Sequence, residues 1–600
     1  MRFRCLLAAV LFIICAMIGI ASHPLLAAEY FFDSQMGSDE NSGTNPDKSL
    51  RTLEKLAALK LDPGDVVRFK RGCEFRGVLS FRGNGIADNP IRLTAYGDGP
   101  KPEFLGSIRL TEWEKHEGEV YMKVVPVEEF VGKKMVYSIY EYAEGKVPVR
   151  LLRDNAIPTE RGRFFFNEDT FTVYLITSDG SPPSEHRIEV SVIENLVSLT
   201  DRRWIEMDNL AFLFGNCRHI VISNSSDITI KNCASLFVGF YGNPNILIVR
   251  DSTRISLVDC FLYENANCGV FISSGSNRCL VSGCTIVKCR SNDGVTLHSG
   301  GLDENGVRQG ITGDYNVVEN NVIGLCPEES IDITSGDYHI IRGNICYGNR
   351  NPGIIVGHDA DHILIQNNIS FNNARAGIQI SGSKQEGARG HNQVIQNLVY
   401  NNGYPGLEIQ SENAKVFNNT VIDSINRVAV RINPQSEGLE FRNNLIATLD
   451  SNIGHRSLHF IGCTPTSLGV NLSHNLFFHR ADQIKPETFF PAGQLIRTDD
   501  GSFSLTEFTA KYGTGEDSFI AEPEFASGKN GYYFLTSDSP GVDAGTDVGL
   551  PFAGSAPDIG WKELGAENTA PKYPPVLIDG GDDDDEEILY LWGKIAKRHE

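Results

Sequence analysis

The sequence predicts an all-β chain whose central half winds as a β-solenoid. Two short phrases recur together along residues 205–480, each at a base interval of about 23 residues. Both phrases alternate aliphatic residues with other types, as strands with one buried face do. Because no helical period lies between them, two or more short strands in each interval predict one coil of a solenoid.

The first phrase places Asn or Cys between two groups of aliphatic residues. This position is occupied by Asn209, Cys233, Cys260, Cys284, Asn321, Asn344, Asn368, Asn397, Asn419, Asn444 and Asn475. In a solenoid these side chains stack at roughly 4.8 Å, the spacing of neighbouring strands. Each amide can then bond its neighbours and the turn backbone, so we expect an asparagine ladder. Where Cys occupies the position, we expect a buried stack of unbonded thiols.

The second phrase is a small residue followed by aliphatic, variable and aliphatic residues. The aliphatic side chains are expected to point inward, so the variable residue points outward, as does the residue two positions later. The first outward column is Phe271, Thr296, Asp332, Ile355, Gln379, Glu408 and Arg431. The second outward column is Ser273, His298, Thr334, Gly357, Ser381, Gln410 and Asn433. Neither column contains lysine, which a plain solvated face usually carries.

The N-terminus has the features of a signal peptide over residues 1–28. Arg2 and Arg4 precede an apolar run of about fifteen residues, Leu6–Ile20, which is short for a membrane span. Small residues at 27 and 28 offer a cleavage site. The segment predicts export to the periplasm or the exterior and a mature chain without a membrane span; an uncleaved anchor is the alternative.

The mature chain is expected to divide into several segments around the coils. Leucines at 53, 56 and 61 are spaced for a short helix that would cover the open end of the solenoid. The predicted order is an N-terminal cap with the first coils at 29–104, an inserted β-rich lobe at 105–200, regular coils at 201–480, C-terminal coils and a cap at 481–565, and a disordered acidic tail at 566–600.

Composition excludes some partners. The formal net charge is −22, which argues against nucleic acid because phosphate binding needs clustered Lys and Arg. The thirteen cysteines include no Cys-x-x-Cys pair, so the usual spacing of zinc ligands is missing.

We expect the protein to be a monomer.

Short stretches near both ends of the mature chain resemble a known superfamily. They are Tyr30-Phe31-Phe32-Asp33, Asn41-Ser42-Gly43-Thr44, Pro63-Gly64-Asp65, Ser539-Pro540-Gly541-Val542-Asp543-Ala544-Gly545 and Pro557-Asp558-Ile559-Gly560. With the coils between them, the chain resembles secreted right-handed parallel β-helix proteins of the pectate-lyase-like and chondroitinase-like type. The resemblance implies that fold, an extracellular location and a polysaccharide partner, and it specifies activity poorly.

Residues 290–362 form the densest acid–base patch of the chain. His298 and Asp332 occupy outward columns on neighbouring coils, and His358 follows the next outward strand, so these three are the predicted catalytic residues. Asp293 and Glu329 are expected at the edge of the same groove as substrate contacts. Longer loops at 299–315 and 383–391 would wall the groove.

The leading hypothesis is a polysaccharide lyase that acts by β-elimination on a uronate-containing glycan. Related lyases commonly use Lys or Arg as base, often with calcium. Here His298 or His358 would serve as base, and calcium, the one cofactor considered, would bind the carboxylates of Asp337, Asp359 and Asp361.

Two alternatives remain open. Asn292-Asp293-Gly294, Gly357-His358 and Arg431-Ile432 distantly resemble polygalacturonase motifs, so a glycoside hydrolase could use Asp332 with Asp293 or Glu329. A non-catalytic glycan-binding or adhesin solenoid is the other. Glu408 and Arg431, one coil apart, are either substrate contacts or an ion pair.

Overall fold

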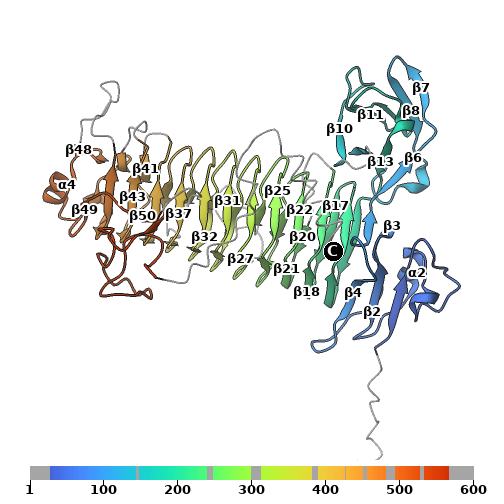
Figure 1. Cartoon of the computed structure of the whole chain (residues 1–600), viewed down its shortest axis with the longest axis horizontal. Helices are drawn as coiled ribbons and strands as arrows, with labels where there is room; N and C mark the ends of the chain where they lie inside the picture. Colours follow the sequence, from blue (N-terminus) through green and yellow to red (C-terminus); the bar gives the residue numbers. More distant parts are fainter. Residues whose placement is uncertain are drawn as a thin grey trace, which may run out of the picture.

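The computed structural model describes residues 27–142, 147–239, 247–298, 313–381, 390–425, 428–450, 456–480, 493–526 and 533–565. These residues form an elongated solenoid, with a lobe projecting near its N-terminal end (Figure 1). Most of the predicted signal peptide, most of the predicted groove loops at 299–315 and 383–391, and the acidic tail lie outside the described residues. None of the helices in the described part has the length and hydropathy that crossing a membrane requires.

Three long sheets make the solenoid, and we number them I, II and III in the order in which each regular coil visits them. Within the described residues sheet I has 13 strands. In spatial order they are β14 (Asn195–Thr200), β17 (Arg218–Ser223), β20 (Leu247–Arg250), β23 (Val270–Ser273), β26 (Val295–His298), β29 (Ile331–Asp337), β32 (Ile354–Asp361), β35 (Ile378–Ser381), β38 (Leu407–Gln410), β41 (Val428–Ile432), β44 (Arg456–Phe460), β47 (Ile496–Thr498) and β48 (Gly501–Phe503).

Sheets II and III have 14 strands each in the described part of the chain. Sheet II runs β1 (Glu29–Phe32), β2 (Val66–Lys70), β4 (Ile91–Tyr96), β15 (Arg203–Asp208), β18 (Ser226–Lys231), β21 (Thr253–Val258), β24 (Leu280–Ser282), β27 (Val317–Glu319), β30 (Ile340–Arg342), β33 (Leu364–Gln366), β36 (Gln393–Ile395), β39 (Lys415–Phe417), β42 (Glu440–Arg442) and β45 (Asn471–Ser473). Sheet III runs β3 (Glu74–Arg76), β5 (Glu103–Leu105), β16 (Ala211–Leu213), β19 (Ala234–Leu236), β22 (Phe261–Tyr263), β25 (Thr285–Val287), β28 (Val322–Gly324), β31 (Ile345–Tyr347), β34 (Ile369–Phe371), β37 (Leu398–Tyr400), β40 (Thr420–Ile422), β43 (Leu445–Thr448), β46 (Leu476–His479) and β49 (Phe519–Ile520).

The lobe is inserted between β5 and β14. Its sheet of eight described strands has the spatial order β6 (Ser107–Leu110), β13 (Arg187–Ser191), β9 (Ile139–Tyr142), β10 (Val149–Arg153), β11 (Arg163–Asn167), β12 (Thr172–Ile176), β8 (Val120–Val124) and β7 (Glu114–Glu117). Phe164, Leu175 and Ile188 are fully buried in its own apolar core, separate from that of the coils. The lobe is therefore a small packed unit beside the solenoid.

The remaining elements are short. They are η1 (Pro46–Lys48), α2 (Leu53–Ala58), η2 (Val127–Glu129), η3 (Pro183–Glu185), α3 (Pro465–Leu468), α4 (Leu505–Tyr512) and the pair β50 (Phe525–Ala526) and β51 (Phe534–Leu535). Leu53 and Leu56 of α2 are buried in the same core cluster as the first strands, as their spacing predicts.

The predicted β-solenoid is confirmed, and so is the register of its outward face. The strands of sheet I pair in parallel as Phe271↔Thr296, Thr296↔Asp332 and Asp332↔Ile355, and the same column continues to Arg431. The flanking aliphatic residues are buried. Which side chains share this face is therefore fixed by the hydrogen-bonded register.

The asparagine ladder is also confirmed between sheets II and III. From Asn321 to Asn444, each side-chain Nδ2 donates to Oδ1 of the next coil's Asn at 2.9–3.1 Å, and Asn475 is the last acceptor. The prediction is wrong at Asn209. Leu210, which precedes Ala211 as Cys233 precedes Ala234, occupies the ladder position, and Asn209 takes the left-handed corner before it with φ 60°.

The predicted thiol stack continues this ladder. Cys233, Cys260 and Cys284 are buried and free, and the backbone N–H of Cys260 donates to Cys284 Sγ at 3.5 Å. The backbone N–H of Cys284 in turn donates to Asn321 Oδ1 at 2.8 Å. Thiols and amides thus occupy one continuous column inside the coils.

Candidate active site

Four carboxyl side chains gather where the chain passes from sheet III into sheet I. Asp293 lies in the turn between β25 and β26, and Glu328 and Glu329 lie in the corresponding turn one coil later. Carboxylate oxygens of these three residues lie within 4.8 Å of one another. Asp332 joins them from β29, where it points outward and is half-buried. We call Asp293, Glu328, Glu329 and Asp332 the carboxylate cluster.

Asp293 and Glu329 occupy the same position of the repeat. Val295 pairs with Ile331, so the residues two places before them face each other on neighbouring coils. The equivalent positions in four other coils hold Cys268, Pro352, Ala376 and Pro405, all buried. Two acidic residues therefore interrupt a column that is otherwise apolar or weakly polar. Aligning the second sequence phrase two places upstream would have revealed this.

Hydrogen bonds hold the buried pair in place. Asp293 Oδ1 accepts the backbone N–H of Glu329 at 3.1 Å, and Oδ2 accepts the hydroxyl of Thr296 at 2.8 Å. The Glu329 carboxyl also hydrogen-bonds the Asp293 side chain. On the outer strand, the hydroxyl of Thr334 donates to Asp332 Oδ2 at 3.0 Å. Each acid except the exposed Glu328 thus has a defined hydrogen-bond partner.

Burial among like charges raises the pKa values of the cluster. Burial, then the Asp293 charge, raises the pKa of Glu329 to about 9. The same two causes, in the same order, raise the pKa of Asp332 to about 8. Burial also raises the pKa of Asp293, which the hydrogen bonds from Thr296 and Glu329 partly offset. At neutral pH the carboxyl groups of Glu329 and Asp332 therefore stay protonated. A general acid must be in this protonated state before it can donate a proton.

Glu328 differs from the other three because its side chain is exposed. Its pKa is raised by partial burial and by the Asp293 charge. Contact with water favours the charged form of a carboxyl group. The cluster thus combines two acids that are protonated at neutral pH, Glu329 and Asp332, with one acid open to solvent.

His298 ends β26 in the second outward column. Leu297 pairs with Ile333, so the neighbour of His298 on the next strand is Thr334, and Asp332 lies diagonally from it. Its ring centroid is 6.0 Å from that of Phe271. The predicted catalytic His358 is in β32, but its side chain and that of Asp359 lie outside the described residues.

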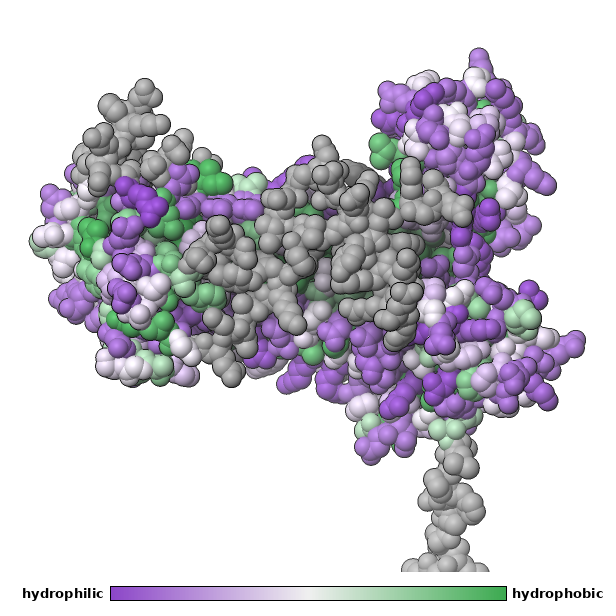
Figure 2. Space-filling view, viewed as in Figure 1, coloured by the Kyte–Doolittle hydropathy of each residue, from purple (hydrophilic) through white to green (hydrophobic). Residues whose placement is uncertain are grey.

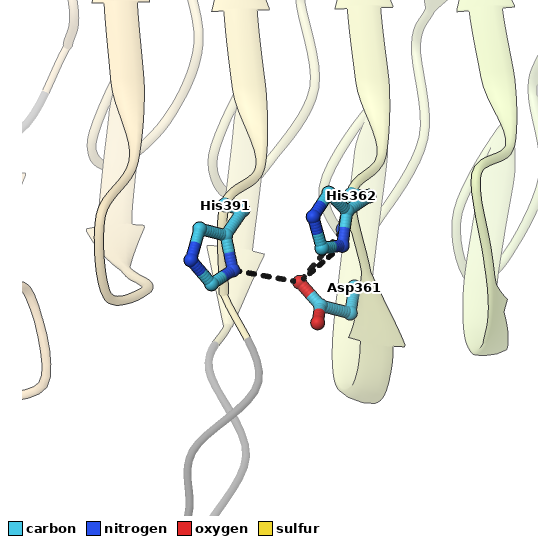
Figure 3. Close-up of side chains that lie close together, drawn as sticks. All are labelled: Asp361, His362 and His391. Carbon is cyan, nitrogen blue, oxygen red and sulfur yellow. Dashed lines mark hydrogen bonds and ion pairs between the residues drawn. The ribbon is translucent and has the colours of Figure 1, made fainter.

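Of the residues predicted to hold calcium, the structure describes the side chains of Asp337 and Asp361. Asp337 and Asp361 are register partners on β29 and β32. Asp361 Oδ1 instead lies 3.2 Å from His362 Nδ1 and 3.4 Å from His391 Nδ1 (Figure 3). The same oxygen accepts the backbone N–H groups of His362 and Gly390, at 2.8 and 3.0 Å.

The geometry of this His–Asp–His group favours a hydrogen-bonded corner over a metal site. The two imidazole rings stack with centroids 4.8 Å apart and planes 14° apart. Nearly parallel rings keep their lone pairs in nearly parallel planes, whereas the ligands of a tetrahedral ion approach it from different directions. The contact between His391 and Asp361 could not be predicted from the spacing of the sequence, because His391 follows a long insertion in its coil.

Glu408 and Arg431, the other predicted substrate contacts, bind each other. Arg431 Nη1 lies 3.4 Å from Glu408 Oε1, and Asn433 Nδ2 donates to the same oxygen at 3.0 Å. The Arg431 guanidinium also lies 5.9 Å from the ring centroid of Tyr404. Both charges therefore have partners within the protein, and a contact with substrate remains a prediction.

Comparisons with known proteins agree with the fold. A family model described as "Right handed beta helix region" matches residues 305–446. No curated protein matches the sequence. A solved complex of XylC with xylose is similar over 83% of this chain and 87% of that one, at 13% identity and TM-score 0.45.

Two further solved structures are similar to parts of this chain. Pectate lyase Pel9A is 12% identical over 90% of this chain and 97% of its own, with TM-score 0.36. A GH136 lacto-N-biosidase from Eubacterium ramulus is 13% identical over 65% and 67%, also with TM-score 0.36. Together with the sheet topology, the matched region makes this chain a right-handed parallel β-helix.

Proposed function

We propose that this chain is a glycan-cleaving enzyme whose catalytic centre is the carboxylate cluster, and that it hydrolyses glycosidic bonds. One observation carries the proposal: two carboxyl groups in the same cluster have opposite environments. Asp332 is held protonated by burial and by Asp293, while Glu328 is open to water. Glycoside hydrolysis needs this division between a protonated acid and an ionised carboxylate.

The roles follow from exposure. Asp332 points outward from sheet I and would protonate the leaving glycosidic oxygen. Glu328 would act from the other side of the bond as base or nucleophile. Asp293 and Glu329 are buried behind them and act as positioning residues: the charge of Asp293 raises the pKa of Asp332, and Glu329 hydrogen-bonds Asp293.

A polysaccharide remains the proposed substrate class. The motifs near both ends of the mature chain resemble those of secreted polysaccharide-acting β-helix proteins, and the N-terminal segment has the pattern of an export signal. We therefore place the activity outside the cytoplasm.

β-Elimination is a second candidate, favoured by one specific feature. Asp293, Glu328 and Glu329 bring carboxylate oxygens within 4.8 Å of one another, a spacing that lets three oxygens meet one calcium ion at roughly 2.4 Å. Such an ion would neutralise a uronate carboxylate, and His298 would be the base. In this candidate mechanism the carboxylate cluster binds the calcium ion, in place of the predicted ligands Asp337, Asp359 and Asp361.

The test is a panel of neutral and uronate-containing polysaccharides. New reducing ends and unsaturated-uronate absorbance are measured in parallel, with EDTA or with added calcium. Reducing ends without absorbance, unchanged by EDTA, support hydrolysis. Absorbance that EDTA removes supports elimination and overturns the hydrolytic proposal. No product from any member of the panel overturns both.

Variants connect the activity to the cluster. Asp332→Asn and Glu328→Gln are each expected to lower the rate at least ~100-fold, as the loss of a general acid or base does. Glu319→Gln is the matched control, because Glu319 lies on sheet II and pairs with Arg342 at 2.6 Å. Full activity in Asp332→Asn would remove Asp332 from the mechanism.

A further inference from the structure

A cavity lies at the junction of the lobe and the coils. Its volume is about 630 Å³, within the range of pockets that hold small ligands. Figure 1 shows β10 on the side of the lobe that faces the solenoid. The polar side chains that line the cavity are Tyr137, Arg150, Arg153, Asn155, Arg163 and Arg290.

The four arginines come from both sides of the junction. Arg150 and Arg153 are on β10, and Arg163 begins β11, so the lobe supplies three of them. Arg290 comes from the solenoid, in the same turn as Asp293. No carboxylate from the described residues lines the cavity. Figure 2 shows that the visible surface of the lobe is largely hydrophilic.

The arginines from β11 and from the coil have acidic partners. Arg163 bonds Asp154 and Glu160, each at 2.8 Å. Arg290 pairs with Glu264. These partners hold the two guanidinium groups in place but do not line the cavity themselves.

The positive charges of the two β10 arginines, Arg150 and Arg153, are less fully neutralised by acidic side chains. Arg153 approaches Glu168 only to 3.9 Å, and its guanidinium lies 5.6 Å from the ring centroid of Tyr137. Arg150 has no ion pair with any described residue. The cavity thus presents positive charge that the protein itself compensates incompletely.

Arg290 is only partly compensated as well, although it pairs with Glu264. Burial, then the charge of Arg150, lowers the pKa of Arg290 to about 10. Its Nε is buried without a hydrogen-bond partner. A buried donor without an acceptor costs free energy, and so do two cations held close together in the protein. An anion in the cavity would offset the repulsion between Arg150 and Arg290.

We propose that this pocket binds an anionic sugar residue, through its carboxylate or sulfate group. Guanidinium groups bind the paired oxygens of such groups through two parallel hydrogen bonds. The site rests on the proposed function for the identity of its ligand as a glycan. Arg290 lies three residues before Asp293, so at most about 10 Å of backbone separates them. A sugar in the pocket would then belong to the chain that is cut at the carboxylate cluster.

The test measures binding to the full chain by calorimetry. Oligogalacturonate probes the carboxylate, chondroitin sulfate oligosaccharide probes the sulfate, and methyl-esterified oligogalacturonate is the neutral control. The protein carries Asp332→Asn, which prevents turnover and leaves the pocket intact. We expect one anionic oligosaccharide to bind at least 10-fold more tightly than the neutral control, with affinity that falls as salt increases.

Variants then locate the binding. Arg150→Gln is expected to weaken the anionic ligand ~10- to 100-fold, the value of a charged hydrogen bond. Arg153→Gln is a second variant, in case the first unfolds. Arg161→Gln is the control, because Arg161 is exposed on the same lobe and pairs with Glu119 at 2.7 Å. Equal binding of anionic and neutral ligands, or unchanged binding in both pocket variants, overturns the inference.

The two proposals fail separately. Cleavage of neutral glycans without Arg150-dependent anion binding would overturn the pocket and leave the catalytic proposal standing. Anion binding that depends on Arg150, without cleavage of any glycan by the wild-type chain, would support the pocket and overturn the catalytic proposal.

Discussion

Replacing Glu329 by glutamine tests the electrostatics of the carboxylate cluster directly. Glu329 is 8% exposed and hydrogen-bonds the Asp293 side chain. Glutamine has nearly the same shape, can donate a hydrogen bond to Asp293 and cannot ionise. The variant therefore reproduces the protonated form of Glu329 at every pH.

The sign of the effect follows from the pKa of Glu329, which is raised from 4.5 to about 9 on folding. Below pH 4 the side chain is protonated in both states. From there to about pH 9 only the unfolded chain releases the proton, so the wild-type protein loses stability as the pH rises. Glu329→Gln should lack this loss.

The magnitude has an upper bound set by the shift. At about 1.4 kcal/mol per pKa unit, the proton retained at pH 7 corresponds to at most ~3 kcal/mol. Asp293 and Asp332 share the same interactions, so we expect the variant to gain ~1–2 kcal/mol over wild type at pH 8 to 9 and almost nothing at pH 4.

The assay is chemical unfolding of both proteins across this pH range, followed by tryptophan fluorescence. Glu319→Gln, on sheet II, is the control and should show no gain that grows with pH. The reasoning is refuted if Glu329→Gln is destabilised equally at all pH values, because a difference that does not change with pH means that folding does not raise the pKa of the Glu329 carboxyl.

The remaining predictions concern the acid, the ladder and the thiols. If Asp332 is the general acid, the rate of wild-type cleavage should fall as the pH rises above about 8, where the pKa of its carboxyl lies, and a rate that is flat to pH 10 would exclude this role. Asn397→Ala should cost ~2–4 kcal/mol in the free energy of unfolding, because it leaves several buried groups without partners, whereas the exposed Asn471→Ala should cost less than ~0.5 kcal/mol. The eleven described cysteines are buried thiols, so a thiol reagent should react with almost none of them in native protein and with all of them after unfolding without reductant; a lower count after unfolding would indicate disulfides.

The repeat made the fold predictable because one position recurs in every coil. A one-residue shift in a strand would expose its aliphatic side chains, so the alternating pattern determines which side chains of sheet I point outward. The ladder was predictable for a similar reason, since a buried amide needs a partner in the next coil. The misplaced Asn209 shows the limit: a lone Asn at a left-handed corner looks the same in sequence as one in the ladder.

The site was less predictable because its members meet across coils of unequal length. Thirty-six residues separate Asp293 from Glu329, and the insertion between them hides their common position in the repeat. His391 reaches Asp361 across another insertion. The arginine pocket depends on how the lobe packs against the coils, and no periodicity encodes that contact.

The buried acids in the cluster are better explained by function than by folding. At the position of Asp293 and Glu329, other coils hold Cys, Pro or Ala, which satisfy the packing without charge. Placing two carboxyl groups there costs free energy, since burial raises both pKa values and the charge of Asp293 raises that of Glu329 further. Glu408 and Arg431 also lie on sheet I, but their opposite charges neutralise each other at 3.4 Å. This chain pairs opposite charges in one coil but places acidic side chains next to one another in another, at a cost in folding free energy. Such energetic costs are characteristic of sites where chemistry occurs.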